Sequence, residues 1–182
     1  MPTLSVAHVF GSVGSQAIYQ DSRLQYVSPQ IRESWQNNPI VHIEIPEYVA
    51  GRKRAFEEAL HMTRAAHKAG VPFLAGTDSG GVPYLYYGFS LHDELALLVQ
   101  ADFTPMEALQ AAALKPAQFL GIADQLGTIT EGKQADLVLL EANPLDDIRN
   151  TRRIHAVVVR GHYLDRAALD ALLNQAKSAA SH

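Results

Sequence analysis

The stretch Val71-Pro-Phe-Leu-Ala-Gly-Thr-Asp-Ser-Gly-Gly81 decides how the rest of this chain is interpreted. It predicts a short buried strand, Val71 to Ala75, which leads into a glycine-flanked carboxylate at Asp78. Proteins with α/β folds present a reactive group at the carboxyl edge of a sheet in this way. The alternative is an ordinary β-turn in which Asp78 bonds its own backbone, as Asp often does. The local pattern leaves both interpretations open.

Composition limits the classes of protein to which the chain can belong. Its 182 residues, 47% hydrophobic and 19% charged, predict a soluble globular protein with one sizeable domain. The net charge of −4 argues against a nucleic-acid partner, and the lack of cysteine excludes disulfides and Cys-ligated zinc. No apolar run is long enough to span a membrane, and the first residues do not resemble a signal peptide. We therefore expect no membrane partner and, by default, a cytoplasmic location.

The first 45 residues predict a strand, a loop and a helix. Residues 3–10 are apolar and β-branched, which indicates a strand in which His8 is a core or edge residue rather than a ligand. Ser28 and Pro29 are typical of a helix start, and Ile31 and Trp35 would share its buried face. Residues 40–45 predict either a strand or an extended loop.

If residues 40–45 form a strand, His42 and Glu44 point to one face and could form a metal pair. We prefer the alternative, in which they lie on the polar outer face of an edge strand. Residues 46–68 predict a long amphipathic helix that stops at Gly70.

Two further helices and a β-rich segment follow the Asp78 stretch. Ser90 is a good N-cap for a helix whose buried stripe contains Leu91, Leu95, Leu98 and Val99. His92, in the first turn, is either a functional residue or an exposed one. Residues 104–107 form a capping box, and residues 127–132, 135–140 and 154–159 predict strands before a final helix at 164–177.

The order of these motifs resembles the carboxyl-terminal part of the amidohydrolase superfamily. The similarity is to its imidazolonepropionase-like and prolidase-related members. It rests on motifs that occur in the same order as in that family, namely Ala75-Gly-Thr-Asp-Ser79, Leu91-His-Asp-Glu-Leu95, Thr104-Pro-Met-Glu-Ala-Leu109, Lys115-Pro-Ala-Gln-Phe-Leu-Gly121, Gly127-Thr-Ile-Thr-Glu-Gly-Lys-Gln-Ala-Asp-Leu-Val138 and Asn143-Pro-Leu-Asp-Asp-Ile148. Each motif alone is weak, whereas the ordered series is specific. It covers residues 71 to about 170 well and the first 40 residues loosely.

This resemblance implies an α/β fold, the carboxyl-terminal part of a (β/α)8 metal-dependent hydrolase barrel, or TIM barrel, with strands of a small β-sandwich. It divides the chain into barrel elements at 1–124, a sandwich segment at 125–164 and a helix and tail at 165–182. Asp78 matches the catalytic aspartate that ligates a divalent metal, usually zinc, and takes a proton from the attacking water. His92 matches a histidine near the substrate or behind the metal ligands. The implied substrate is a small-molecule amide, cyclic amide or dipeptide.

The chain also departs from the family pattern. That family needs a His-x-His pair and further ligands on earlier strands, and no His-x-His occurs here. Residues 3–10 and 71–75 would match the seventh and eighth barrel strands, so one aspartate is left where a catalytic zinc takes about three protein ligands. We therefore expect an incomplete site that needs a complementing upstream fragment. The alternative is a non-catalytic remnant that acts as a binding or oligomerisation module, favoured as a homo-oligomer by open strand edges.

Overall fold

The computed structural model describes residues 1–43 and 45–181 of the chain. Helices dominate, with one small sheet near the carboxyl end. The elements in chain order are α1 (Leu4–Ser12), α2 (Gln16–Tyr19), the 3-10 helix η1 (Ser22–Tyr26), α3 (Pro29–Gln36), η2 (Pro39–His42), α4 (Pro46–Lys68), α5 (Phe89–Gln100), α6 (Pro105–Ala112), α7 (Leu114–Phe119), β1 (Leu137–Leu140), η3 (Ile148–Arg152), β2 (Ile154–Val159), β3 (His162–Leu164) and α8 (Arg166–Ala179).

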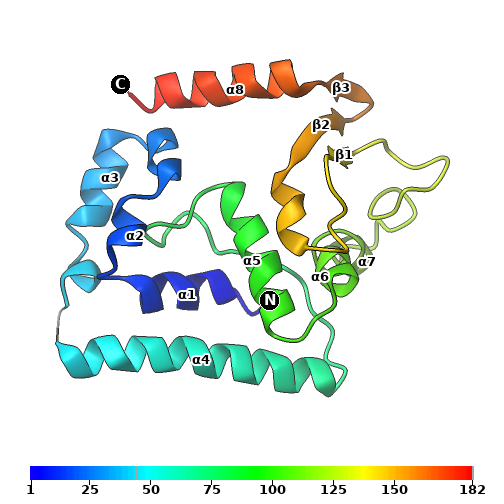
Figure 1. Cartoon of the computed structure of the whole chain (residues 1–182). Coiled ribbons are helices and arrows are strands. Elements are labelled where there is room, and N and C mark those ends of the chain that lie inside the picture. Colours follow the sequence, from blue (N-terminus) through cyan, green and yellow to red (C-terminus); the bar gives the residue numbers. More distant parts are fainter. Residues whose placement is uncertain (44, 182) are drawn as a thin grey trace.

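The centre of the molecule is helix α5, around which the other long elements are arranged. In Figure 1, α4 and α1 lie side by side along one end of the molecule, and α8 crosses the opposite end. The main core forms where α1, α4, α5 and α6 meet, and Leu98 of α5 is fully buried there. A second cluster includes Tyr84 and Leu85, which come from the loop between the Asp78 stretch and α5. The loop is therefore anchored in its middle by packing against Val9 of α1 and against Val41.

The predicted strand at residues 3–10 is wrong, because this segment forms the helix α1. Its buried residues Leu4 and Ser5 are adjacent in the sequence, which does not fit the alternation of buried and exposed residues along a strand. Leu4 packs in the main core with residues of α4 and α5, and Val9 packs in the second cluster with Tyr84 and Leu85. Tertiary packing has overridden the β preference of Val6 and Val9.

The described residues contain one three-stranded antiparallel sheet, in the order β1-β2-β3. Leu137 pairs with Val158, Val157 pairs with Leu164, and the register shifts between Leu139 and Leu140. The predictions of strands at 135–140 and 154–159 and of a link into Tyr163 are confirmed. One edge, β1, carries Val138 and Leu139, which are 57% and 40% exposed.

Three other strand predictions fail or cannot be assessed. Residues 71–75 pair with no described strand. They are held by a bond from the Ala75 N–H to the Ala111 carbonyl oxygen (2.9 Å) and by Phe73, whose ring meets Phe103 edge-on in the main core. Residues 127–132 form bends and turns, and η2 (Pro39–His42) covers the first part of the segment predicted at 40–45. Glu44 lies outside the described residues, so the His42–Glu44 pair is not placed. A strand needs a neighbouring strand to satisfy its N–H and C=O groups, and these segments have none in the described chain.

The helix signals were more reliable than the strand signals. Ser28 caps α3, Thr104 and Glu107 form the capping box of α6, and α4 has the predicted bounds. Two details are wrong: Ile31 is 46% and Leu91 37% exposed, so neither belongs to a buried stripe. Helix α5 begins two residues earlier than predicted, because its N-cap is Gly88 rather than Ser90. Among the described helices, none is long and apolar enough to cross a membrane.

Candidate functional site

Asp78 stands at the tip of an exposed turn. Its own φ is 55°, in the left-handed region, which Asp tolerates better than most residues do. The turn is held by Thr77, whose Oγ1 accepts the Ser79 N–H (3.3 Å) and lies 2.9 Å from the Ser79 hydroxyl. None of the residues that the structure describes donates a hydrogen bond to the Asp78 carboxylate, so the alternative of an Asp that bonds its own backbone is wrong. The carboxylate is therefore available to solvent or to a ligand.

A buried carboxylate that the sequence analysis did not single out lies close to this turn. Glu94, on α5, is 0% exposed and accepts the Leu4 N–H (3.0 Å) and the Ser5 N–H (2.7 Å). These are the first two N–H groups of α1, which have no partner within their own helix. Thr3, the N-cap of α1, makes no side-chain bond, so Glu94 caps α1 from another helix.

The Glu94 cap connects to the Asp78 turn through Ser5. The Ser5 hydroxyl donates a long bond to the Thr77 carbonyl oxygen (3.5 Å). Burial raises the pKa of Glu94, and its hydrogen bonds from Ser5 and Leu4 partly oppose that shift. The signal that was missed is the spacing of Ser90, Glu94, Leu98 and Ala101, which places a carboxylate on the buried face of α5.

His92 lies apart from these groups and contacts a different element. Its Nδ1 is 3.0 Å from the Thr151 Oγ1, and the Thr151 hydroxyl donates to the Ile148 carbonyl oxygen (2.8 Å). Because that hydroxyl has one hydrogen, it must accept from His92, which places the ring hydrogen on Nδ1 and leaves Nε2 as an acceptor. Burial and the nearby Arg152 lower the pKa of His92, so the ring is neutral at pH 7.

The pocket beside His92 has a volume of about 670 Å³ and lies between α5, β2 and α8. Asp78 is not among the residues that line it. No hydrogen bond between described residues joins His92 to the Asp78 turn. The structure therefore does not bring the two predicted site residues into one pair.

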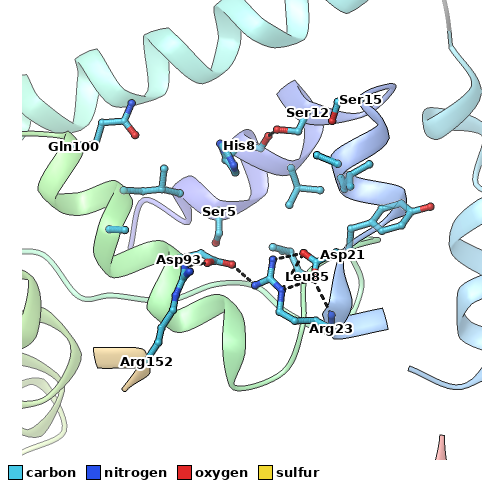
Figure 2. A pocket seen from close by; sticks show the side chains of 16 residues that line it. Ser5, His8, Ser12, Ser15, Asp21, Arg23, Leu85, Asp93, Gln100 and Arg152 are labelled. Carbon is cyan, nitrogen blue, oxygen red and sulfur yellow. Dashed lines mark hydrogen bonds and ion pairs between the residues drawn. The ribbon is translucent and has the colours of Figure 1, made fainter. Parts of the chain in front are cut away.

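A network of ion pairs lies between α1, η1 and α5, beside a second pocket of about 330 Å³ (Figure 2). Asp93 is shared by two cations: Arg23, at 2.5 Å from Nη1, and Arg152. Arg23 also pairs with Asp21 (2.6 Å). His8 lines this pocket as well, and burial lowers its pKa. Because each arginine already has a carboxylate partner, we interpret the network as an element that ties η1 and η3 to α5.

The described residues do not fit a metal centre by themselves. No group of three His, Asp or Glu side chains that could hold a metal occurs within residues 1–43 and 45–181. The Asp78 carboxylate is alone at its turn, His42 bonds the Gln36 carbonyl oxygen, and His67 stacks on Phe103 with ring centroids 3.8 Å apart. A catalytic zinc takes about three protein ligands, and this donor set offers one.

The amidohydrolase family model matches residues 24–164, which is most of the chain, and the protein belongs to that family. Members of this family are hydrolases of carbon–nitrogen bonds and generally use divalent metals. Their solved relatives imply a TIM-barrel-type fold, to which this chain contributes mixed helix and strand. The predicted membership is confirmed.

Individual relatives match over parts of their length. Imidazolonepropionase of Thermoplasma volcanium is 30% identical over 95 residues, which cover 52% of this chain and 23% of that protein. Ochratoxinase of Aspergillus niger is 28% identical over 167 residues, which cover 79% of this chain and 33% of that protein. The solved structure of bottromycin amidohydrolase superposes with a TM-score of 0.77 at 28% identity, covering 98% of this chain and 39% of that one. The chain therefore spans less than half the length of these relatives.

Proposed function

We propose that this chain is the carboxyl-terminal part of a metal-dependent amidohydrolase that cleaves a C–N bond in a small amide, cyclic amide or dipeptide. The observation that carries the proposal is the Asp78 turn, an exposed carboxylate without a hydrogen-bond donor inside the segment that matches the family. The division into barrel elements at 1–124, a sandwich segment at 125–164 and a tail at 165–182 remains part of this proposal.

In the proposed site, Asp78 accepts a proton from the attacking water and returns it to the leaving nitrogen. A carboxylate with no donor of its own is suited to that role, because its lone pairs remain free for the transferred proton. Asp78 would also be one ligand of the divalent metal, probed first as zinc, with the other ligands supplied by residues outside this chain. Since the described residues do not fit the metal alone, the 182-residue chain by itself should be inactive.

His92 remains a proposed near-site residue with a supporting role. Its neutral ring and free Nε2 suit a hydrogen bond to substrate or to a neighbouring residue, and its contact with Thr151 holds the ring in one orientation. Turnover that persists unchanged in His92→Ala would remove it from the site.

A chimaera tests the proposal. It consists of the part of bottromycin amidohydrolase that this chain does not cover, followed by this chain. We expect stoichiometric metal and hydrolysis of amide or dipeptide substrates, with kcat/KM lowered about 10²- to 10⁴-fold in Asp78→Asn. The matched control is Asp124→Asn, at another exposed aspartate, which should have the turnover of the parent chimaera. Full turnover in Asp78→Asn would contradict the proposal.

The second candidate function is a non-catalytic module that binds a partner or forms oligomers. The exposed apolar edge of β1, with Val138 and Leu139, favours it, because an open strand edge can pair with a second copy. Light scattering of the 182-residue chain distinguishes the two. A dimer that becomes monomeric in Val138→Lys supports the module, and a monomer at all concentrations argues against it.

A further inference from the structure

A small aromatic pocket adjoins the Asp78 turn, separate from the two larger pockets described above. It has a volume of about 130 Å³. Its walls come from the end of η1, from α3 and from the loop that leads into α5. The residues that line it are Tyr26, Val27, Ser28, Ile31, Trp35, Leu85, Tyr86, Tyr87 and Phe89.

The walls of this pocket are held by contacts between aromatic rings. Tyr26 stacks on Phe89 with ring centroids 5.4 Å apart, and Trp35 meets Tyr86 edge-on at 5.7 Å. Tyr86 is also almost fully buried, at 3% exposed. Rings in offset and edge-to-face contact stabilise one another beyond the area that they bury. The pocket is therefore preformed, so a ligand would not have to order these side chains.

The volume selects the size of the occupant. Sites for whole small molecules have volumes of about 300–1,000 Å³, and this pocket is well below that range. An apolar cavity of about 150 Å³ accepts benzene. A pocket of 130 Å³ therefore accepts one ring or one branched aliphatic group, which is the size of a single side chain rather than of a whole substrate.

The charge around the pocket selects the chemistry of the occupant. None of the lining residues carries a formal charge at pH 7. Aromatic walls attract cations, but here a cation is already present, since the Arg23 guanidinium carbon lies 4.4 Å from the centroid of the Tyr86 ring. Arg23 already covers the Tyr86 ring and is paired with Asp21 and Asp93, and the lining residues offer no counter-ion to a buried cation or anion. The occupant must therefore be uncharged.

The pocket and the Asp78 turn are in contact through Tyr87. This residue forms part of the pocket wall, and its hydroxyl lies 2.9 Å from where a Cβ on Gly80 would be. Gly80 is two residues from Asp78, and its φ of 130° also favours glycine. The turn and the part of the pocket wall formed by Leu85, Tyr86 and Tyr87 belong to one continuous loop, residues 76–88. A group held in the pocket is thus held beside the turn that presents the carboxylate.

From this juxtaposition we infer that the aromatic pocket receives an uncharged, ring-sized side chain of the substrate, flanking the C–N bond presented to Asp78. This inference rests on the proposed hydrolytic function, because only that function makes the ligand of the pocket a substrate. Substrates with a phenylalanine- or leucine-like side chain are preferred over those with alanine, lysine or glutamate.

Trp35 provides a direct test, because it is the only tryptophan in the chain and lines the pocket. The 182-residue chain is titrated with N-acetylphenylalanine amide, which does not absorb where tryptophan is selectively excited. The expected result is a saturable change in Trp35 emission, with affinity about tenfold or more above that for the alanine and Nα-acetyl-lysine amides. No saturable change, or an equal response to the lysine amide, overturns the inference.

Matched variants locate the response. Val27→Phe fills the pocket and should weaken binding about tenfold or more, whereas Val71→Phe adds the same ring at a residue 48% exposed and outside the pocket, and should bind normally. Circular dichroism and a thermal melt check that both variants fold. Equal binding by the two folded variants overturns the inference. The hydrolytic proposal is tested by a different measurement, the turnover of the Asp78→Asn chimaera. The two tests are independent because the binding titration needs no catalysis.

Discussion

Two carboxylates close to the same loop have opposite environments. Asp78 is exposed and receives no hydrogen bond from the described residues, whereas Glu94 is 0% exposed and accepts two backbone N–H groups of α1. A buried charge persists only where donors compensate its lost hydration, so Glu94 is committed to the fold. An exposed carboxylate without donors contributes little to stability and is free for chemistry. The contrast separates the residue that builds the site from the residue that would act in it.

The largest expected effect comes from Glu94→Ala. The substitution leaves the Leu4 and Ser5 N–H groups buried without an acceptor, and each such group costs about 1–3 kcal/mol. We expect the free energy of unfolding to fall by about 3 kcal/mol in chemical denaturation. Glu58→Ala, at an exposed glutamate of α4, is the control and should change it by less than about 0.5 kcal/mol. A Glu94→Ala chain as stable as the control would show that the cap is dispensable.

A smaller loss is expected from Gly80→Ala, which strains the loop between the two carboxylates. The φ of 130° is unfavourable for alanine, and the added Cβ would meet the Tyr87 hydroxyl at 2.9 Å. Strain of this kind costs about 1–3 kcal/mol. Gly14→Ala also has a positive φ, of 93°, but meets no atom within 4 Å, so it shows the cost of a left-handed backbone without a steric contact and should lower the melting temperature less. Identical melting temperatures would contradict the contact.

The pH dependence of stability should also distinguish a buried from an exposed carboxylate. Burial raises the pKa of Glu94 above its ordinary value of 4.5, so between these two values the folded state binds more protons than the unfolded state does. The contribution of Glu94 to the free energy of unfolding therefore decreases as pH rises through this window, by at most about 1.4 kcal/mol per pH unit.

Glu107 should give the opposite sign. Hydrogen bonds from Thr104 lower the pKa of Glu107, so its contribution is present above pH 4.5 and is lost as pH falls. Chemical denaturation of Glu94→Gln and Glu107→Gln, from below pH 4.5 to above it, measures how the free energy of unfolding of each variant changes with pH relative to the parent chain. Slopes of the same sign for the two variants would refute the assignment.

The smallest effect on stability is expected from Asp78→Asn. Asn tolerates the left-handed conformation as Asp does, and no hydrogen bond to the carboxylate is lost, so the free energy of unfolding should change by less than about 0.5 kcal/mol. The same substitution should lower kcat/KM of the chimaera about 10²- to 10⁴-fold. A large loss of stability would mean that Asp78, like Glu94, is committed to the fold.

Local signals in the sequence predicted much of the helical structure. Ser28 and the Thr104–Glu107 capping box act over three residues, and their hydrogen bonds form whatever surrounds them. The β-branched residues Val6 and Val9 led to a wrong strand prediction. A strand needs a neighbouring strand, and no described strand pairs with residues 3–10. Residues 154–159 were predicted correctly because their partners lie close in sequence, on β1 and β3.

By itself, the sequence determined the family, the capped helices and the identity of Asp78 as the residue to test, because these depend on short ordered motifs. Tertiary structure alone decided that α1 is a helix, that Glu94 caps it from α5 and that His92 faces Thr151. It also brought Trp35 to the loop that follows Asp78. These facts depend on contacts between residues up to 90 positions apart, and a local pattern can place a side chain on a buried face without specifying which distant group it meets there.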